Sequence, residues 1–390
     1  MTNEFIFWFC LSVLFYTYLG YGGVIWCWTR FKRLFSAPPR LESNPSYPSV
    51  SLVIAAYNEK SILAQKIENC KALLYPKDLL EIVFVTDGSD DGSESFIREN
   101  SDFKVFHSPD RKGKTAALNR VVPQLENEIL VFTDANTDLN QESIQRLVQP
   151  YSDPNIGAVS GEKRVGGIET DKAHGAGEGL YWKYESALKH MDAEVHTIVG
   201  AAGELFSVRR SLFPSVPEDT ILDDFMITLG IVARGYRVGY VSDAFALEAP
   251  SASLMDEMGR KIRICAGGFQ SIVRLPQMLN VFKHPTATFQ YVSHRILRWT
   301  LAPFLLPILF VSNLIMANGS TFYSSVLGLH IGFYVLAGLG YLTRKKAIRS
   351  PWLFTPLYFL MMNLAAYLGL YKYLRGNQHA AWQKVKRAGS

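Results

Sequence analysis

Acidic residues follow several apolar runs of this 390-residue chain, in positions where they could act on a bound ligand. "VFTDANTDLN" at 131–140 places Asp134 and Asn136 after such a run, "VFVTDGSDDGS" at 83–93 places Asp87 and Asp91, and "SLVIAAYNE" at 51–59 ends on Glu59. Each residue alone suits a turn or a helix cap equally well. Together they suit a ligand rich in hydroxyl or amide N–H groups, accompanied by a divalent cation.

A second acidic group stands in "PEDTILDDFMITLG" at 217–230. Acids at a helix N-terminus are favoured by the helix dipole, which is sufficient to explain Glu218 and Asp219. It explains less well Asp223 and Asp224, which directly precede the apolar Phe225. The pair therefore indicates a functional site at Asp224.

A basic segment, "RKGKTAALNR" at 111–120, places Lys112 and Lys114 around Gly113 at an expected helix start. Cations and backbone N–H groups there suit a phosphate, although a solvated basic helix start is the alternative. The segment is not a Walker sequence, and no Gly-x-Gly-x-x-Gly fingerprint follows the first expected strand.

The elements that position these residues alternate. Short β-branched runs at 50–56, 81–86, 103–107 and 128–133 are separated by helix-compatible stretches at 59–74, 92–100 and 113–126. This succession predicts an α/β fold with a mostly parallel, Rossmann-like sheet covered by helices. Ligands of such sheets bind beyond the carboxyl ends of the strands, where the acids stand.

The ends of the chain are apolar. Residues 5–28 carry no charge and exceed the roughly 20 residues that a membrane-spanning helix needs. Glu4 before the run and Arg30, Lys32 and Arg33 after it predict a retained anchor with its N-terminus outside and the next domain in the cytoplasm. The expected divisions are an anchor at 1–29, a linker at 30–48, a catalytic domain at 49–290, membrane helices at 291–375 and a basic tail at 376–390.

Three more apolar segments lie near 300–317, 322–342 and 352–371. Three spans would place the tail outside, whereas Lys384, Lys386 and Arg387 favour the cytoplasm. The first segment, which contains Pro303 and Pro307, is therefore the candidate for a re-entrant or interfacial helix, and the number of spans stays open.

The remaining composition excludes other classes. A net charge of +5, concentrated beside apolar segments, suits anionic membrane lipids and indicates no nucleic-acid partner. The spacing of the four cysteines matches neither a zinc site nor a disulfide framework.

Five motifs in order resemble those of family 2 glycosyltransferases with the GT-A fold: "SLVIAAYNE", "VFVTDGSDDGS", "GKTAALN", "FTDANT" and "ILDDF" followed by "GYRVGYVSDAFALE". Their place between membrane segments is similar to the subgroup of hyaluronan, chitin, cellulose and poly-N-acetylglucosamine synthases. The resemblance covers about 50–275.

The resemblance implies roles for individual residues. The metal ligands would be Asp134 and Asn136, binding Mg²⁺ or Mn²⁺, and Asp224, with Asp223 beside it, would be the catalytic base. The donor-binding residues would be Ala55, Tyr57, Glu59, Asp87, Asp91, Lys114, Asp134, Arg260 and Arg263.

Three positions depart from the family pattern. Asn136 supplies one negative charge fewer than the usual Asp, which predicts a cation held jointly with the donor diphosphate. "RKIRICAGGFQSI" at 260–272 lies where the synthases carry Gln-x-x-Arg-Trp, so Arg260 replaces the Gln and Ile264 the Trp. Arg263 retains the Arg, which would clamp the diphosphate, and the alternative is a basic face at the membrane surface. The missing Trp argues against processive polymer synthesis.

The expected protein is an integral protein of a bacterial-type inner or plasma membrane. It would transfer a sugar, with inversion, from a UDP-sugar to a growing polysaccharide or lipid-linked glycan, in contact with membrane lipids and other glycan-assembly proteins. The alternative is a catalytically silent sugar-nucleotide-binding scaffold, and a transporter is disfavoured because the apolar segments lack charges. The sugar, linkage and acceptor are not determined by the sequence.

Overall fold

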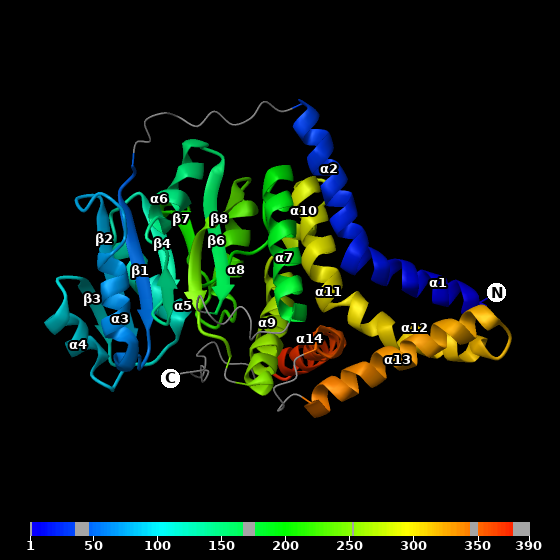
Figure 1. The fold of residues 1–390 in the computed structure, drawn as a ribbon. Coiled ribbons are helices and arrows are strands. Elements are labelled where there is room, and N and C mark those ends of the chain that lie inside the picture. Colours follow the sequence, from blue (N-terminus) through cyan, green and yellow to red (C-terminus); the bar gives the residue numbers. More distant parts are fainter. Residues whose placement is uncertain (1, 36–46, 167–175, 252, 344–349, 377–390) are drawn as a thin grey trace.

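A computed structural model describes residues 2–35, 47–166, 176–251, 253–343 and 350–376 (Figure 1). One sheet of eight strands carries the fold, in the order β3-β2-β1-β4-β7-β6-β8-β5. The strands are β1 Val50–Ala56, β2 Leu80–Asp87, β3 Lys104–Ser108, β4 Ile129–Asp134, β5 Thr137–Leu139, β6 Ile156–Val165, β7 Leu205–Arg209 and β8 Arg237–Glu248.

The first half of the sheet confirms the predicted βαβ succession. Strands β1 to β4 pair in parallel, and the connecting helices are α3 Lys60–Lys71, α4 Ser93–Asn100 and α5 Lys114–Val121. In the β1–β4 register Ala55 pairs with Asp134, so the ends of these strands meet at one edge. The predicted α/β fold class is confirmed.

The second half differs from the expected parallel arrangement, so the sheet as a whole is mixed. Strand β7 pairs antiparallel with both β4 and β6, β5 pairs antiparallel with β8, and β6 and β8 are parallel. Because β7 runs in reverse, the residues before it, rather than after it, reach the edge where Asp134 lies. Thr133 of β4 indeed pairs with Leu205, the first residue of β7.

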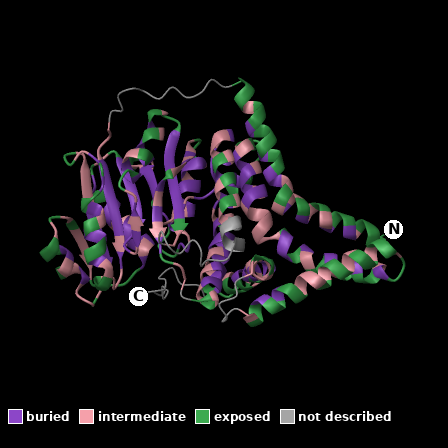
Figure 2. Cartoon of the chain, in the orientation of Figure 1, coloured by how far each residue is buried: buried purple, intermediate pink, exposed green. Residues whose placement is uncertain are grey.

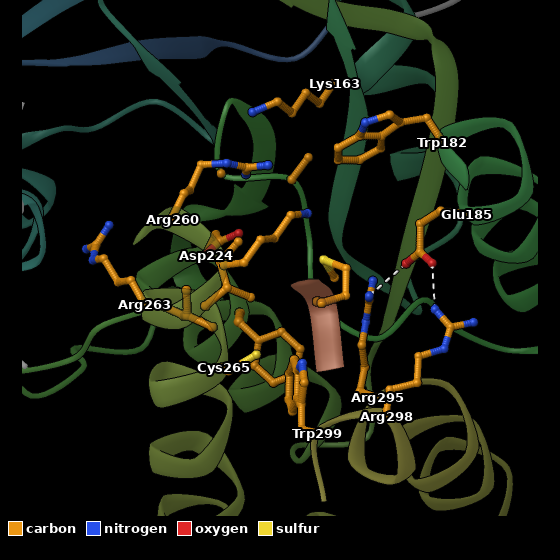
Figure 3. A pocket seen from close by; sticks show the side chains of 18 of the residues that line it. Lys163, Trp182, Glu185, Asp224, Arg260, Arg263, Cys265, Arg295, Arg298 and Trp299 are labelled. Carbon is orange, nitrogen blue, oxygen red and sulfur yellow. Dashed lines mark hydrogen bonds and ion pairs between the residues drawn. The ribbon is translucent and has the colours of Figure 1, made fainter. Parts of the chain in front are cut away.

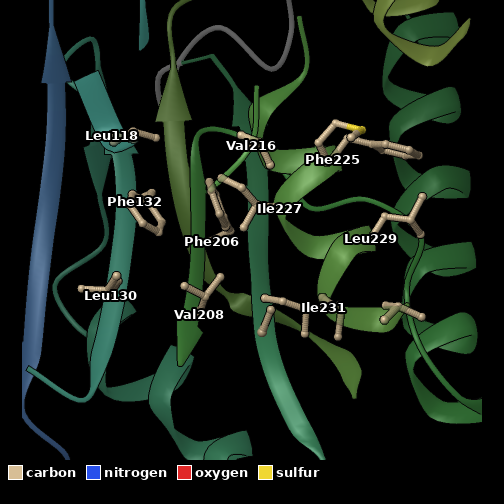
Figure 4. Packing of buried hydrophobic residues seen from close by; sticks show 14 of the residues in the cluster. Leu118, Leu130, Phe132, Phe206, Val208, Val216, Phe225, Ile227, Leu229 and Ile231 are labelled. Atoms are coloured by element: carbon tan, nitrogen blue, oxygen red, sulfur yellow. The ribbon is translucent and has the colours of Figure 1, made fainter. Parts of the chain in front are cut away.

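The core lies on both faces of the sheet, as the burial colours show (Figure 2). Alternate residues of β4 face opposite sides: Leu130 and Phe132 join one buried cluster, and Ile129 and Val131 the other. On the first side α8 (Asp223–Val232) packs against the central strands (Figure 4). Phe132 stacks on Phe206 of β7 with ring centroids 4.9 Å apart.

The remaining helices fall into two groups. Around the sheet are α6 Ser143–Val148, α7 Ala176–Val195, α9 Leu254–Arg274, α10 Pro285–Tyr291 and α11 Leu297–Trp299, with 3-10 turns η2 Val122–Gln124, η3 Gln149–Ser152, η5 Arg210–Leu212 and η6 Pro276–Leu279 and the π-helical turn η7 Val292–Ile296. The apolar ends form α1 Thr2–Phe15, η1 Tyr16–Gly20, α2 Tyr21–Phe35, α12 Leu301–Ala317, α13 Thr321–Thr343 and α14 Pro351–Leu374.

Three helical segments in the described chain are long and apolar enough to cross a membrane: 2–35, 321–343 and 351–374. A fourth candidate is the pair Pro285–Trp299 and Leu301–Ala317, bent by 54°. This bend falls where the sequence predicts a re-entrant or interfacial segment. Helix α2 continues to Phe35, past the expected end of the anchor, and residues 24–35 contain no glycine or proline that would end it. Residues 36–46 of the expected linker and 377–390 of the expected tail lie outside the described residues.

Helix α9 packs closely against the apolar helix α14 and against Trp299, and glycines at these contacts make the close packing possible. A Cβ at Gly369 of α14 would lie 2.6 Å from the Cβ of Cys265, and one at Gly268 would lie 2.6 Å from the ring of Trp299. Such distances are far below van der Waals contact, so the two helices approach as closely as their backbones allow.

Gly200 provides a test of the packing around α8. Its φ is +81°, and an added Cβ would lie 2.2 Å from the ring of Phe225. We expect Gly200→Ala to destabilise the protein by about 2–4 kcal/mol, from backbone strain and overpacking. The measurement is the thermal unfolding midpoint in detergent. Gly230→Ala in α8 is the control, because its Cβ would lie 3.6 Å from Pro214, an ordinary contact distance. An equal loss of stability in this variant would contradict the explanation by strain and overpacking.

Candidate active site

A cavity of about 1040 Å³ lies at the sheet edge where β4 ends, between the sheet and α9. Figure 3 shows Asp224, Arg260 and Arg263 on one side of it and Trp182, Glu185 and Arg298 on the other. The predicted site residues that line it are Lys114, Asp134, Asp223, Asp224, Arg260 and Arg263. The structure thus brings together acidic and basic residues from four separate motifs of the sequence.

Lys114 is the centre of the charged end. Its Nζ lies 2.7 Å from Asp134 Oδ1 and 3.8 Å from Asp223 Oδ2. Burial lowers the pKa of Lys114, but the two carboxylates outweigh it and the pKa is raised above its usual value. Lys114 is therefore charged, and it bridges the end of β4 and the start of α8.

Asp224 is the acid whose environment suits a proton acceptor. Burial and the neighbouring carboxylate of Asp223 raise the pKa of Asp224 to about 7, against an opposing effect of Lys114. A Cβ at Gly203 would lie 3.3 Å from Asp224 Oδ2, so the loop before β7 leaves room for this carboxyl only because residue 203 has no side chain. The helix N-terminus alone does not account for a buried pair of acids.

The two arginines of α9 have different partners. Arg263 donates from Nη2 to the carbonyl of Ile221, 3.0 Å away, just before the acidic pair. Arg260 forms a bidentate pair with Glu257 one turn earlier, at 2.8 and 3.0 Å. Arg263 is thus positioned beside Asp223 and Asp224, whereas the guanidinium of Arg260 is held by its own helix.

The expected lack of an aromatic face needs correction. Ile264 lines the cavity in place of the family's Trp, but Trp299 and Trp182 line it too, from α11 and α7. Trp299 packs against Phe225, with ring centroids 5.5 Å apart. The aromatic surface comes from elements distant in sequence, so the argument against polymer synthesis from Ile264 alone is weakened.

The residues assigned to the nucleotide lie at the neighbouring strand ends. Asp87 accepts from the backbone N–H groups of Lys112 and Gly113, at 2.9 and 2.6 Å, and so holds the loop before Lys114. The guanidinium of Arg111 lies 3.8 Å from the ring centroid of Tyr57. None of these side chains lines the large cavity. One carboxylate oxygen of Asp87 is already engaged in hydrogen bonds to the loop before Lys114.

Asp91 and Glu59 lie at helix starts. Asp91 accepts from the N–H of Lys60 at 2.9 Å and from the N–H and hydroxyl of Ser93, which start α3 and α4. Burial raises the pKa of Asp91, but these hydrogen bonds outweigh it and lower the pKa. Glu59 is the N-cap residue of α3. In this structure the side chain of Asp91 therefore accepts hydrogen bonds from the first N–H groups of α3 and α4.

The predicted metal ligands fit a cation in their chemistry. Asp134 offers a carboxylate, and Asn136 has a buried Oδ1 that accepts no hydrogen bond from the described residues. The described residues contain no group of three acidic, His or Cys side chains that could hold a metal. Because Lys114 already pairs with Asp134, a cation here needs further oxygens from a ligand.

The cavity also contains charged groups that the sequence did not reveal. Lys163 pairs with Glu204, at 2.5 Å, and with Glu248. Burial raises the pKa of Glu204, but Lys163 outweighs it and lowers the pKa to about 2. Lys163 lies near the end of β6, Glu248 ends β8 and Glu204 directly precedes β7, so these residues meet only through the pairing of strands that are far apart in the sequence.

Glu185 forms the far side of the cavity. Its carboxylate lies 2.7 Å from Arg295, 2.9 Å from Arg298 and 3.1 Å from His294. Burial raises the pKa of Glu185, but these cationic neighbours hold it well below its usual value. No local pattern in α7 predicts this, because all three partners are more than 100 residues away.

Comparison with known proteins gives a domain-level match. Residues 51–216 match the model described as "Glycosyl transferase family 2". A poly-β-1,6-N-acetyl-D-glucosamine synthase of Staphylococcus aureus is 26% identical over 236 residues, 58% of this chain and 56% of that protein. A β-monoglucosyldiacylglycerol synthase of Synechocystis is 26% identical over 250 residues, 60% of this chain and 51% of that protein. The matches therefore span little more than half the length of these relatives.

The structure is similar to a mannosyltransferase of Pyrobaculum calidifontis solved in complex with GDP-Man and Mn²⁺. The TM-score is 0.71 at 22% identity, covering 96% of this chain and all of that chain. This likeness supports the fold, and together with the domain match it confirms the predicted resemblance and GT-A fold class.

The raised pKa of Asp224 has a consequence for stability. Between the ordinary pKa of an aspartate, 3.8, and about 7 the folded state binds the proton more tightly than the unfolded state, so Asp224 reduces stability as the pH rises through this range. We expect Asp224→Asn to stabilise the protein by about 1–3 kcal/mol near pH 8 and to have little effect near pH 4.

The measurement is the difference in thermal midpoint between variant and wild type across this pH range. Asp219→Asn is the control, because hydrogen bonding to Arg274 lowers the pKa of this exposed acid. A stabilisation of Asp224→Asn that does not grow with pH would contradict the assignment.

Proposed function

Because residues 51–216 of this chain form a family 2 glycosyltransferase domain, we propose that the protein transfers a sugar from a nucleotide-sugar donor to a hydroxyl acceptor at a membrane. The observation that carries the proposal is Asp224. Its buried carboxyl, with a pKa raised to about 7, shares one cavity with the Lys114–Asp134 pair. A scaffold without catalytic activity does not need a carboxyl group whose pKa is raised to about 7.

Asp224 acts as the general base. A group with a pKa near the working pH is deprotonated often enough to accept a proton and basic enough to do so efficiently. The acceptor oxygen attacks the anomeric carbon from the side of Asp224 while the diphosphate leaves on the other side, so the configuration inverts. Trp299 and Phe225 beside Asp224 exclude water from this side.

The diphosphate of the donor is bound at the Lys114 end. Lys114 supplies a fixed positive charge, and the backbone N–H groups at the start of α5 face the same end. Arg263 lies beside the acidic pair and adds a second cation. A divalent cation held by Asp134 and Asn136 would neutralise negative charge on the departing nucleoside diphosphate.

The donor is proposed to be a UDP-sugar. The curated relatives are named for N-acetylglucosamine and glucosyl products, and the resemblance implies that Asp87 and Tyr57 contact the base or ribose. Those relatives make a polysaccharide and a glycolipid by name, so both acceptor classes remain in the proposal. The candidate membrane spans support a reaction at a membrane, and the sheet domain is proposed to lie in the cytoplasm.

The first test concerns the base. We expect Asp224→Asn to lower turnover of a radiolabelled UDP-sugar by at least about 100-fold while donor binding persists, because only proton transfer is removed. Wild-type turnover should rise with pH and level off above about 7. Asp219→Asn is the control. Undiminished turnover by Asp224→Asn would contradict the assignment of Asp224 as the general base. No turnover by the wild type with any UDP- or GDP-sugar, offered with membrane lipid extract, would favour the scaffold.

The second test concerns the cation. We expect Asn136→Asp to lower the Mn²⁺ concentration needed for half-maximal turnover by about fivefold to tenfold, because it adds a negative ligand. Manganese binding without nucleotide, followed by electron paramagnetic resonance, should also become detectable. Asp138→Asn, which changes an acid bonded to Gln65, is the control. Full wild-type activity in excess chelator would remove the cation from the proposal.

A further inference from the structure

The cavity extends well beyond the charged residues at the sheet edge. Past Trp299 and Cys265 it is lined by residues of the first and last apolar helices: Tyr18, Leu19, Tyr358, Phe359, Met362 and Asn363. The segments 2–35 and 351–374, which contain these residues, are both candidate membrane spans. One continuous cavity therefore connects Asp224 with the walls of two helices suited to a lipid bilayer.

The first helix forms its wall through η1, the π-helical turn at Tyr16–Gly20. Tyr18 donates its hydroxyl to Asn363 of α14 at 2.7 Å, and its ring packs against Phe359 with centroids 4.9 Å apart. The carbonyl of Tyr18 accepts from Tyr184 of α7 at 2.9 Å. Because a π-turn changes the helix hydrogen-bond pattern, it makes this carbonyl available to another element.

The two sides of the cavity differ in their lining. Glu185 forms a charged cluster with Arg295 and Arg298 at the side of the cavity opposite Asp224 (Figure 3). On the side of η1 and α14 the apolar lining residues are Leu19, Phe359 and Met362, and the lining residues with a polar group are Tyr18, Thr355, Tyr358, Asn363 and Lys372. The hydroxyl of Tyr18 is bonded to Asn363, so these two groups are engaged with one another rather than with a sugar, and Leu19, Phe359 and Met362 supply surface suited to a hydrocarbon tail.

From this arrangement we propose that the acceptor is an amphiphilic membrane lipid with a compact headgroup. The inference rests on the proposed transferase function. The headgroup oxygen reaches Asp224 beside Trp299, and the hydrocarbon tail lies between η1 and α14 along Leu19, Phe359 and Met362. The lipid enters from the bilayer, so its tail never crosses the sheet domain.

The transfer balances without a further reagent. The acceptor oxygen forms a bond to the anomeric carbon, and the bond from that carbon to the diphosphate oxygen breaks. A hydroxyl acceptor passes its proton to the Asp224 carboxylate, whereas a phosphate acceptor attacks through an oxygen that is already deprotonated. In either case the nucleoside diphosphate leaves with the electron pair. The product is a glycosylated lipid whose tail is already in the membrane.

The test uses the full-length protein in detergent with a radiolabelled UDP-sugar and Mn²⁺. Three acceptor arms are offered: phosphatidylglycerol vesicles doped with diacylglycerol, the same vesicles doped with polyprenyl phosphate, and a soluble oligosaccharide. We expect label to enter the organic phase with a lipid arm, and the arm that works identifies whether the headgroup oxygen is a hydroxyl or a phosphate.

Two variants fill the proposed tail site from opposite walls. Leu19→Trp and Met362→Trp should each raise the KM for the lipid by at least about tenfold with donor binding unchanged, because a larger ring occupies the path of the tail. Leu364→Trp is the matched control on α14, since Leu364 is 51% exposed and does not line the cavity. Its KM should remain within about twofold of wild type.

The outcomes separate the two proposals. Labelling of the oligosaccharide with none in either lipid overturns the lipid acceptor and leaves the transferase. The same holds if the donor is turned over only with water, or if Leu19→Trp and Met362→Trp match Leu364→Trp. No turnover of any donor overturns both proposals, whereas lipid labelling lost in the two cavity variants supports both.

Discussion

The ammonium group of Lys114 determines how the charged end of the cavity is organised. A buried charge is costly unless it is paired, so Lys114 must stay beside the carboxylates of Asp134 and Asp223. That requirement ties three elements together: the end of β4, the start of α5 and the start of α8. Asp87 sets the position of the lysine itself, because it holds the backbone of the two preceding residues. The site is therefore a chain of electrostatic constraints that begins at β2 and ends at Asp224.

The same pairing explains how the site can remain stable without a donor. Asp134 and Lys114 satisfy one another in the structure, so neither depends on a cation or a phosphate to compensate its charge. A donor brings its own negative charge for Lys114 and its own oxygens for a cation. Under the proposed function the ion pair would be exchanged for equivalent contacts, and we expect donor and cation binding to depend on one another.

The sequence predicted what depends on local pattern. The β-branched runs located β1 to β4, the uncharged runs located the apolar helices, and the acids before Phe225 located the start of α8. It did not predict the reversed strand β7, which brings Gly203 and Glu204 to the site from the amino end of a strand. It also missed Glu185 and Trp299, because the partners of Glu185 and the cavity that Trp299 lines are assembled from segments far apart in the chain.

The glycines at which α9 meets α14 and Trp299 of α11 have a consequence for how this protein can be rearranged. Residues 268 and 369 accept no side chain without moving Trp299 or the backbone of α9. Helix α14 is thereby a structural part of the sheet domain, although it follows all of that domain in the chain. We therefore expect the sheet domain, when produced without α14, to expose the face of α9 that packs on Gly369.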